Sequence, residues 1–347
     1  MSFFIGADVS SLQAMEDNGA VFFDVDGKKD DALTILKNHG FNSIRLRIFN
    51  NPTKSFDRGD YCNVENTLPI AKRIKDMGLG LYLDFHYSDF WADWQKQNIP
   101  NEWADKNEEE LVDAVYQFTL DSLLRFKANN SWPDIVQIGN EIGRGLLWHY
   151  GTLDNPKAMV AFINAGIKAV KDASDSLNKQ PKIMIHVEYG ADKEMTEKFF
   201  TLLHDNHVDD YDFIGLSYYP YWAGEYDRFI ENARHVYQLF KKKVIIAETA
   251  FPYTDVSNDD TPNVVNGELT MSAMGLGANI DNQYFALRKI VSIAKEEDSV
   301  EGIYYWEPVW YQLKGVGVEK GKGNEWENQA LFDNKGNALK GIEAFAI

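Results

Sequence analysis

The sequence predicts an α/β fold, a closed (β/α)8 or TIM barrel with long loops after several strands. Three observations support this prediction. A short run of β-branched and aromatic residues, a loop and a helical pattern follow one another eight times along the 347 residues. Several runs are almost continuously apolar, as in parallel strands covered on both faces. Eight such units need about 250 residues and leave about a hundred for extended loops.

The strands are expected where the apolar runs lie, at residues 3–9, 43–48, 80–85, 135–139, 182–187, 213–217, 244–247 and 302–306. Between the second and third runs, Ile70, Ile74 and Met77 share one helical face, and Gly78 follows as a stop signal. Asn107 can cap the next helix, with a glutamate three residues later completing a capping box. Four further helices are expected at 156–175, 194–206, 227–240 and 281–297.

The domain organisation is inferred from the absence of a linker between these units. An open doubly wound sheet is the alternative fold, but no G-x-G-x-x-G pattern follows the first strand. No low-complexity stretch or Pro/Ser-rich linker divides the chain, so we expect one domain over residues 1–347. The longest irregular segments, 48–61, 85–107, 249–280 and 306–332, each follow a strand. In a barrel they all emerge on the carboxyl face, where active sites are built.

Composition excludes several classes of protein. Asp and Glu outnumber Lys and Arg by 53 to 35, and the net charge of −18 repels nucleic acid. The one cysteine, Cys62, excludes an intramolecular disulfide and zinc sites made of several thiolates. No window approaches the roughly 18 uninterrupted apolar residues of a membrane-spanning helix. The first residues lack a basic segment followed by an apolar one, so no signal peptide is visible.

The chemistry is predicted from two carboxylates at strand ends. Glu141 follows the fourth apolar run and Glu248 follows the seventh. Closure of a barrel brings such positions together, whereas a single strand-end glutamate is often only a solvated loop residue. Cleavage of a glycosidic bond needs one carboxylic acid to protonate the leaving oxygen and one carboxylate on the other side of the anomeric carbon. The pair therefore indicates glycoside hydrolysis.

Several stretches resemble glycoside hydrolase family 53, the arabinogalactan endo-β-1,4-galactanases. They are residues 6–12 (GADVSSL), 42–47 (NSIRLR), 83–93 (LDFHYSDFWAD), 139–142 (GNEI), 215–222 (GLSYYPYW), 248–253 (ETAFPY) and 305–308 (YWEP). This resemblance covers nearly the whole chain and implies a barrel that cleaves β-1,4-galactan. It further implies that Glu141 is the general acid/base, that Glu248 is the nucleophile and that Asn140 holds the 2-hydroxyl of the sugar.

Other polar residues are expected around the two glutamates. Glu141 must stay protonated and Glu248 ionised, and a bidentate contact from Arg45 would keep Glu248 charged. We expect His86 to orient a catalytic carboxylate or a sugar hydroxyl, because no second histidine lies at metal-ligand spacing. Tyr218 is expected to donate its hydroxyl to the nucleophile. His186 is placed in the same ring of residues.

Aromatic residues are concentrated in the loops that follow the strands. They are Trp91, Trp94, Trp103, Trp222, Trp306, Trp310 and Trp326. Flat aromatic faces stack on pyranose rings, so an open row of them predicts an elongated groove and endo action, although about half are expected to pack under the loops. Trp222 and Trp310 are counted among the substrate-binding residues. By resemblance, Trp306 floors the cleavage subsite, with Asp89 and Trp91 at neighbouring positions.

Two departures from the family pattern concern the loops. Many relatives carry tryptophan where Ala191 stands, so a subsite contact is missing or is supplied by Tyr189. Bacterial relatives often hold calcium after strand seven, and here the corresponding loop lacks the histidine. Calcium is nevertheless a possibility because oxygen ligands remain, and a solvated acidic loop is the alternative. The possible ligands are Asp255, Asp259, Asp260 and Asn263.

The resulting hypothesis is a retaining endo-β-1,4-galactanase that needs no cofactor. Two alternatives remain open: the same chemistry on another β-1,4-glycan, glucan or mannan, or an inactive galactan-binding barrel. We expect a monomer with a polysaccharide as its partner, no nucleic acid and no membrane span. Its expected location is secreted, periplasmic or at the cell surface, with a signal peptide removed.

Overall fold

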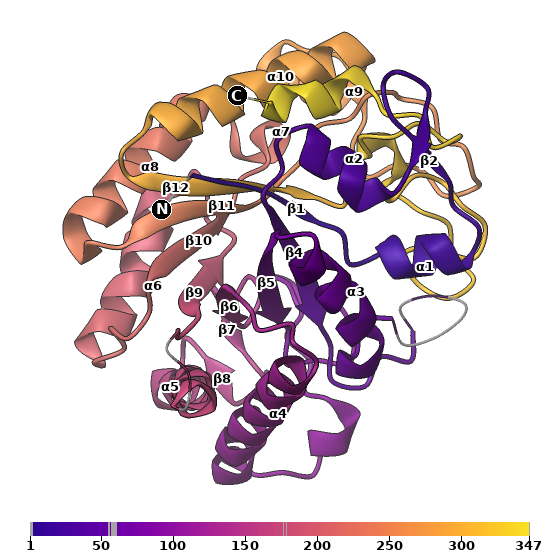
Figure 1. Cartoon of the computed structure of the whole chain (residues 1–347). Coiled ribbons are helices and arrows are strands. Elements are labelled where there is room, and N and C mark those ends of the chain that lie inside the picture. The colour runs from indigo at the N-terminus through magenta and orange to yellow at the C-terminus, as the bar shows by residue number, and fades with distance from the viewer. Residues whose placement is uncertain (1–2, 55, 57–60, 176, 178, 347) are drawn as a thin grey trace.

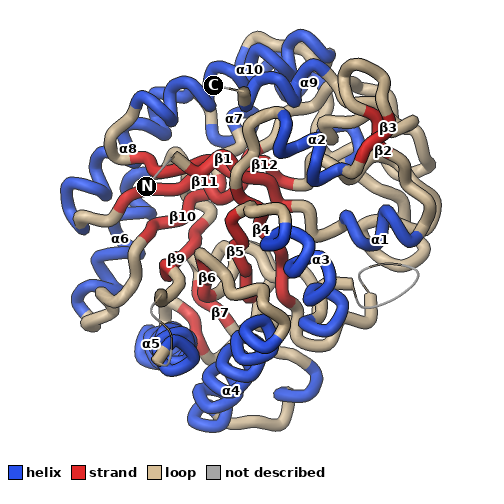
Figure 2. Tube along the Cα trace, in the orientation of Figure 1, coloured by secondary structure: helices blue, strands red, loops and turns tan. Residues whose placement is uncertain are grey.

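In the computed structural model, eight parallel strands close into a barrel that helices surround (Figures 1 and 2). The structure describes residues 3–54, 56, 61–175, 177 and 179–346, so part of the predicted loop 48–61 lies outside it. Around the barrel the strands are β1 (Phe4–Asp8), β12 (Val300–Trp306), β11 (Lys243–Thr249), β10 (Phe213–Ser217), β9 (Lys182–Val187), β6 (Ile135–Ile138), β5 (Gly80–Phe85) and β4 (Ser43–Ile48). Strand β1 pairs with both β12 and β4, which closes the ring. The predicted fold class and strands are confirmed.

The barrel helices are α2 (Ala32–Asn38), α3 (Val64–Asp76), α4 (Glu108–Ala128), α5 (Pro156–Ser174), α6 (Lys193–Asp205), α8 (Tyr226–Phe240) and α10 (Ile280–Glu296). Shorter elements occupy the loops: α1 (Leu12–Asp17), α7 (Pro220–Ala223), α9 (Gly267–Met274), the hairpins β2 (Phe22–Phe23) with β3 (Lys29–Asp30) and β7 (Gly145–Leu146) with β8 (Gly151–Thr152), and three 3-10 turns, η1 (Asn101–Trp103), η2 (Glu327–Gln329) and η3 (Lys340–Phe345). The predicted caps are confirmed, because Asn107 and Glu110 form a capping box and Gly78 adopts φ +73° after α3. Of the described helices, none is long and apolar enough to cross a bilayer.

The amino-terminal half of the barrel interior is an apolar layer. Its side chains come from alternate strand positions that point inward, and they pack as one cluster: Tyr82, Ile135, Met184, Phe213, Ile245 and Tyr304, with Phe4 against them. The ring of Tyr304 fills the space beside Gly6, where an added Cβ would lie 2.1 Å from ring carbons. This layer is therefore a packed plug and leaves no channel through the barrel.

The carboxyl-terminal half of the interior is polar. Two residues beyond Tyr82, Ile135 and Met184 of the apolar layer, the same inward-facing rows carry Asp84, Gln137 and His186, and Asp8 and Arg45 join them from β1 and β4; all five are buried. Because side chains alternate along a strand, each row changes from apolar to polar within a few residues. Charged groups are thus concentrated under the face from which the long loops emerge.

A bulge in β11 turns the nucleophile candidate inward. Leu216 pairs with Ile246, but Ser217 pairs with Glu248, so Ala247 is an extra residue in the ladder. By plain alternation from Ile245, position 247 would face the interior and Glu248 would face out. The bulge reverses this order, as bulges next to active sites commonly do.

Candidate active site

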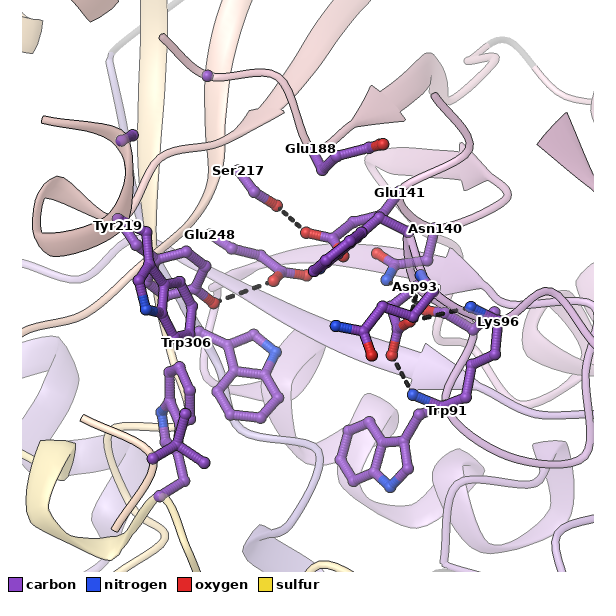
Figure 3. A pocket seen from close by; sticks show the side chains of 18 of the residues that line it. Trp91, Asp93, Lys96, Asn140, Glu141, Glu188, Ser217, Tyr219, Glu248 and Trp306 are labelled. Carbon is purple, nitrogen blue, oxygen red and sulfur yellow. Dashed lines mark hydrogen bonds and ion pairs between the residues drawn. The ribbon is translucent and has the colours of Figure 1, made fainter. Parts of the chain in front are cut away.

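A cleft of about 940 Å³ opens over the polar end of the barrel. Glu141 and Glu248 both line it, together with Asn140, His86 and aromatic residues of the loops. Figure 3 shows the two glutamates lying next to each other, Glu141 beside Ser217 and Glu248 beside Tyr219. The predicted meeting of the two strand-end carboxylates is therefore present in the fold.

Both carboxylate oxygens of Glu248 are held by hydrogen bonds. Arg45 Nη1 donates to Oε1 at 2.8 Å, and the hydroxyl of Tyr219 donates to Oε2 at 3.0 Å. Arg45 is fully buried, and Glu248 is 7% exposed. An ionised carboxylate is stabilised by such donors. Glu248 is thus oriented, and both donors favour its ionised form.

Glu141 is in a different environment. Its Oε1 accepts a hydrogen bond of 2.6 Å from the Ser217 hydroxyl, and within the described part of the chain no cation lies at ion-pair distance from it. Its backbone adopts φ +47°, two residues after Gly139 at φ +76°. Residues other than glycine rarely adopt a positive φ, and they do so mainly where the surrounding structure holds the backbone in place. The sharp turn places the carboxyl group over the cleft.

Electrostatics separate the two glutamates. Burial and the nearby charge of Glu248 hold the pKa of Glu141 well above its usual range. Burial also raises the pKa of Glu248, but the Arg45 guanidinium opposes this rise. A proton shared by the pair therefore resides on Glu141. This is the division between an acid and a nucleophile that glycoside cleavage needs.

Arg45 points inward as predicted, but its predicted bidentate contact with Glu248 is wrong. Nη1 is shared between Glu248 and Asp8, at 2.8 and 3.0 Å, while Nη2 contacts Asp84 at 2.7 Å and Asn140 Oδ1 at 2.8 Å. Burial raises the pKa of Asp84, but Arg45 and His86 outweigh this effect and lower it. One guanidinium thus joins Glu248 to Asn140, the residue that precedes Glu141.

The two predicted histidines support other side chains. His86 accepts from the Ala92 N–H at Nδ1 (3.0 Å), so its Nε2–H faces Asp84 Oδ2 at 3.0 Å. His186 is fully buried, with Nε2 2.9 Å from Ser217 Oγ. Its pKa lies well below the usual range because of burial and the positive charge of Arg45, so the ring is neutral.

The predicted role of Tyr218 is wrong. Its hydroxyl donates to the Gly224 carbonyl at 2.6 Å, and the neighbouring Tyr219 reaches Glu248. Gly215, Ser217 and Tyr219 share one face of the chain, whereas Tyr218 points to the opposite face. Two-residue alternation along 215–219 was the available signal, and it also identifies Ser217, which sequence reasoning missed.

The tryptophans divide into a cleft wall and a backing layer. Trp91 and Trp306 line the cleft, partly exposed, and Trp222 is 53% exposed. Trp310 is fully buried, stacked behind Trp91 at 6.2 Å with 20° between the rings, and it donates to the Val316 carbonyl. Trp310 therefore supports the wall without an exposed face for a sugar, which corrects its predicted role.

A second buried arginine, Arg47, packs against the tryptophans of this cleft wall. The Arg47 guanidinium lies 4.3 Å from the ring centre of Trp91 and contacts Glu307 at 2.7 Å and Asp8 at 3.2 Å. Burial raises the pKa of Glu307 to about 7, against the attraction of Arg47. Sequence reasoning missed Asp8, Asp84 and Glu307, although Asp84 precedes His86 by two residues, as Arg45 precedes Arg47.

Asp89 is not among the residues that line the cleft. Its two oxygens accept from the backbone N–H groups of Asn51 (3.0 Å) and Asn101 (2.8 Å), so it joins two loops. The predicted contact of Asp89 with substrate therefore stays a prediction that its position does not support. Its place in the fold is that of a loop brace.

The four possible calcium ligands are not brought together. Asp255 accepts from the Gly267 N–H, and Asp259 accepts from the backbone N–H groups of Thr261 (2.7 Å) and Asn324 (2.8 Å). The Asn263 amide donates to the Val256 carbonyl at 3.2 Å. Over the described ranges, no group of three or more His, Cys, Asp or Glu side chains is arranged to hold a metal ion. Calcium binding by this loop stays a prediction, and among the described residues no cluster of acidic ligands supports it.

A carboxylic acid and an arginine-held carboxylate at the carboxyl end of a closed barrel are the arrangement of a glycoside hydrolase. The family profile of glycosyl hydrolase family 53 matches residues 4–345, and the chain belongs to that family.

Sequence relatives and solved structures agree with this assignment. The chain is 33% identical to an arabinogalactan endo-β-1,4-galactanase of Cellvibrio japonicus, over 97% of this chain and 89% of that protein. It is also similar to the solved GH53 catalytic domain of Ignisphaera aggregans, with a TM-score of 0.93, 38% identity and coverage of 99% and 95%. A solved fungal β-1,4-galactanase gives a TM-score of 0.85 at 28% identity, with coverage of 99% and 98%.

Proposed function

We propose that this protein is a retaining endo-β-1,4-galactanase that acts on galactan and type I arabinogalactan. The observation that carries the proposal is the unequal pair in one cleft: in the described structure the Glu141 carboxyl group accepts only from the neutral Ser217 hydroxyl, whereas the Glu248 carboxylate is held by Arg45 and Tyr219. The choice of galactan as substrate rests on the names of the relatives. The choice of reaction rests on the two glutamates and their partners.

In the first step Glu248 attacks the anomeric carbon while Glu141 gives its proton to the leaving oxygen. The products are a galactosyl ester of Glu248 and a shortened chain. In the second step Glu141 takes a proton from water, whose oxygen attacks the same carbon and releases Glu248. Two inversions retain the β configuration.

The long wall of the cleft supports endo action. Trp91, Trp306 and Trp222 offer exposed aromatic surface along it, and flat aromatic faces suit the apolar faces of sugar rings. A polysaccharide that lies across such a cleft is cleaved at an internal bond. A polymer substrate of this kind also favours a secreted or cell-surface location.

A panel of polysaccharides tests substrate and mode together. Potato galactan, carboxymethylcellulose and mannan are incubated with the enzyme, and products are sized while reducing ends are counted. We expect rapid shortening of galactan only, and early proton NMR spectra that show β-configured new ends. Preferred cleavage of glucan or mannan contradicts the substrate, early α-configured ends contradict the retaining mechanism, and binding to galactan without cleavage indicates an inactive barrel.

A further inference from the structure

One tryptophan of the cleft has no role in the mechanism above. Trp94 is 41% exposed and lines the cleft. It lies in a tight turn, residues 93–96, closed by the Asp93 N–H to the Lys96 carbonyl (2.8 Å) and the Lys96 N–H to the Asp93 carbonyl (3.0 Å). An Asp93–Lys96 ion pair adds a further link. An exposed indole on a braced turn is unlike the tryptophans that pack under loops.

The turn is attached to the backbone of the acid. The buried Gln97 side chain donates to the carbonyls of Asn140 (2.8 Å), Glu141 (3.3 Å) and Asp93 (3.2 Å). A buried amide with several partners holds its surroundings in one arrangement. The position of Trp94 is thereby fixed relative to Glu141.

Arg144 holds the indole from the other segment. It follows Glu141 by three residues, and its guanidinium lies 5.1 Å from the ring centre of Trp94. A cation over an aromatic face is attracted to it. The indole is therefore clamped between the turn and the segment that carries the acid, while its exposed part borders the cleft.

The chemistry indicates on which side of the cleaved bond Trp94 lies. Glu141 protonates the oxygen of the departing sugar, whereas Glu248 bonds the sugar that stays. Figure 3 shows Asp93 and Lys96 on one side of the glutamates and Tyr219, the partner of Glu248, on the other. Elements joined to the Glu141 segment thus border the part of the polysaccharide that departs after cleavage. Resting on the proposed function, we propose that Trp94, held by Arg144, is a stacking site for a galactose ring on the leaving-group side of the cleaved bond.

Two substrates that differ only on that side test the proposal. Galactan places sugar rings on both sides of the cleaved bond, while β-galactobiosyl fluoride has fluoride alone as its leaving group. For Trp94→Ala we expect kcat/KM on galactan to fall about tenfold, which corresponds to roughly 1.4 kcal/mol. On the fluoride we expect no change. Trp94→Phe should recover most of the loss, since it keeps an aromatic face.

The matched control is Phe285→Ala. Phe285 is 68% exposed on α10, away from the cleft residues, and we expect both activities to match wild type. A Trp94→Ala variant that loses activity equally on both substrates, or on neither, overturns the stacking site. Wild-type enzyme inactive on galactan but active on another β-1,4-glycan overturns the galactan assignment instead.

Added galactobiose gives an independent readout. Its 4-hydroxyl oxygen can attack the galactobiosyl ester of Glu248, releasing the carboxylate and passing its proton to Glu141, so that galactotetraose forms. The acceptor must occupy the leaving-group side. We expect Trp94→Ala to lower the ratio of tetraose to hydrolysis product several-fold, and an unchanged ratio contradicts the proposal.

Discussion

The two ends of the barrel interior are built from the same strands and do opposite things. At the amino end, Phe213, Ile245 and Tyr304 pack with other apolar side chains and bury no charge. At the carboxyl end, Arg45, Asp8 and Asp84 are fully buried in ion pairs. Charges removed from water cost several kcal/mol each before their partners offset it.

The difference indicates that the apolar end stabilises the barrel and that the polar end carries the candidate active site. Apolar burial stabilises the closed ring without geometric demands. The charged layer orients the side chains of the candidate site, and Glu141 and Glu248 have unequal affinities for a proton. Substitutions at the polar end should therefore change turnover, and substitutions at the apolar end should change the free energy of unfolding.

The largest effect on turnover is expected for Glu248→Ala. Activity on galactan should fall roughly 10⁴-fold or more, because the nucleophile is gone. The fold should persist, since Arg45 keeps Asp8 and Asp84 as partners. Added azide should restore turnover on an aryl β-galactoside and give an α-galactosyl azide, detected by mass spectrometry and NMR. A variant with half of wild-type turnover contradicts the assignment of Glu248.

A pair of tyrosine variants sharpens the comparison. Tyr219→Phe removes the donor to Glu248 Oε2, and kcat should fall about 100-fold, because the charge that returns to Glu248 when its galactosyl ester is cleaved loses one donor. Tyr218→Phe is the matched control, because its hydroxyl bonds only the Gly224 carbonyl in the described structure. It should keep kcat and lose about 1 kcal/mol of unfolding free energy. Steady-state kinetics and urea unfolding separate the two, and equal kcat values would contradict the assignment.

A smaller effect with a pH signature is expected for Ser217→Ala. The Ser217 hydrogen bond favours the carboxylate form of Glu141 and so lowers its pKa. Its removal raises this pKa, and the alkaline limb of the kcat profile, which reports loss of the acid's proton, should move to higher pH. The maximum of kcat should fall about tenfold because the acid is less well oriented.

Rescue distinguishes this role from a general loss of structure. Ser217→Thr keeps the hydroxyl, and we expect its alkaline limb to return to the wild-type position. An alkaline limb that does not move in Ser217→Ala would show that the hydroxyl does not tune Glu141.

The smallest effect on turnover is expected at the apolar end. Ile245→Ala should lower the free energy of unfolding by about 3 kcal/mol, because it leaves a cavity in a fully buried site. Well below the unfolding transition, kcat and KM on galactan should equal those of wild type. Urea unfolding followed by fluorescence measures the first quantity. A large fall in kcat would show that the two ends are coupled.

Much of the fold is predictable because its signals are local. Apolar runs mark each strand, and Asn107, Glu110 and Gly78 mark helix ends through contacts within a few residues. The position of Tyr219 is also within reach of the sequence, since it shares a two-residue period with Gly215 and Ser217. From the sequence alone, this alternation favours Tyr219 over Tyr218 as the residue on the face of Ser217.

Other parts of the site depend on contacts between distant segments. The inward turn of Glu248 requires the bulge at Ala247, and no residue type marks that bulge in the sequence. Trp306 and Trp310 lie four positions apart, yet only the packing of loops decides which of them is exposed. Sharing of Arg45 among several acceptors is likewise set by barrel closure.

The seam of the barrel has a consequence for synthesis. Strand β1 is translated first, but its partner β12 contributes residues 300–306, near the end of the chain. Until these residues have left the ribosome, the growing protein exposes unpaired edges on β1 and β11, and Asp8 lacks its neighbours on the last strand. Loop closure over so long a span is slow, so the unpaired edges need protection until the last strand has emerged, and a working catalyst can assemble only afterwards.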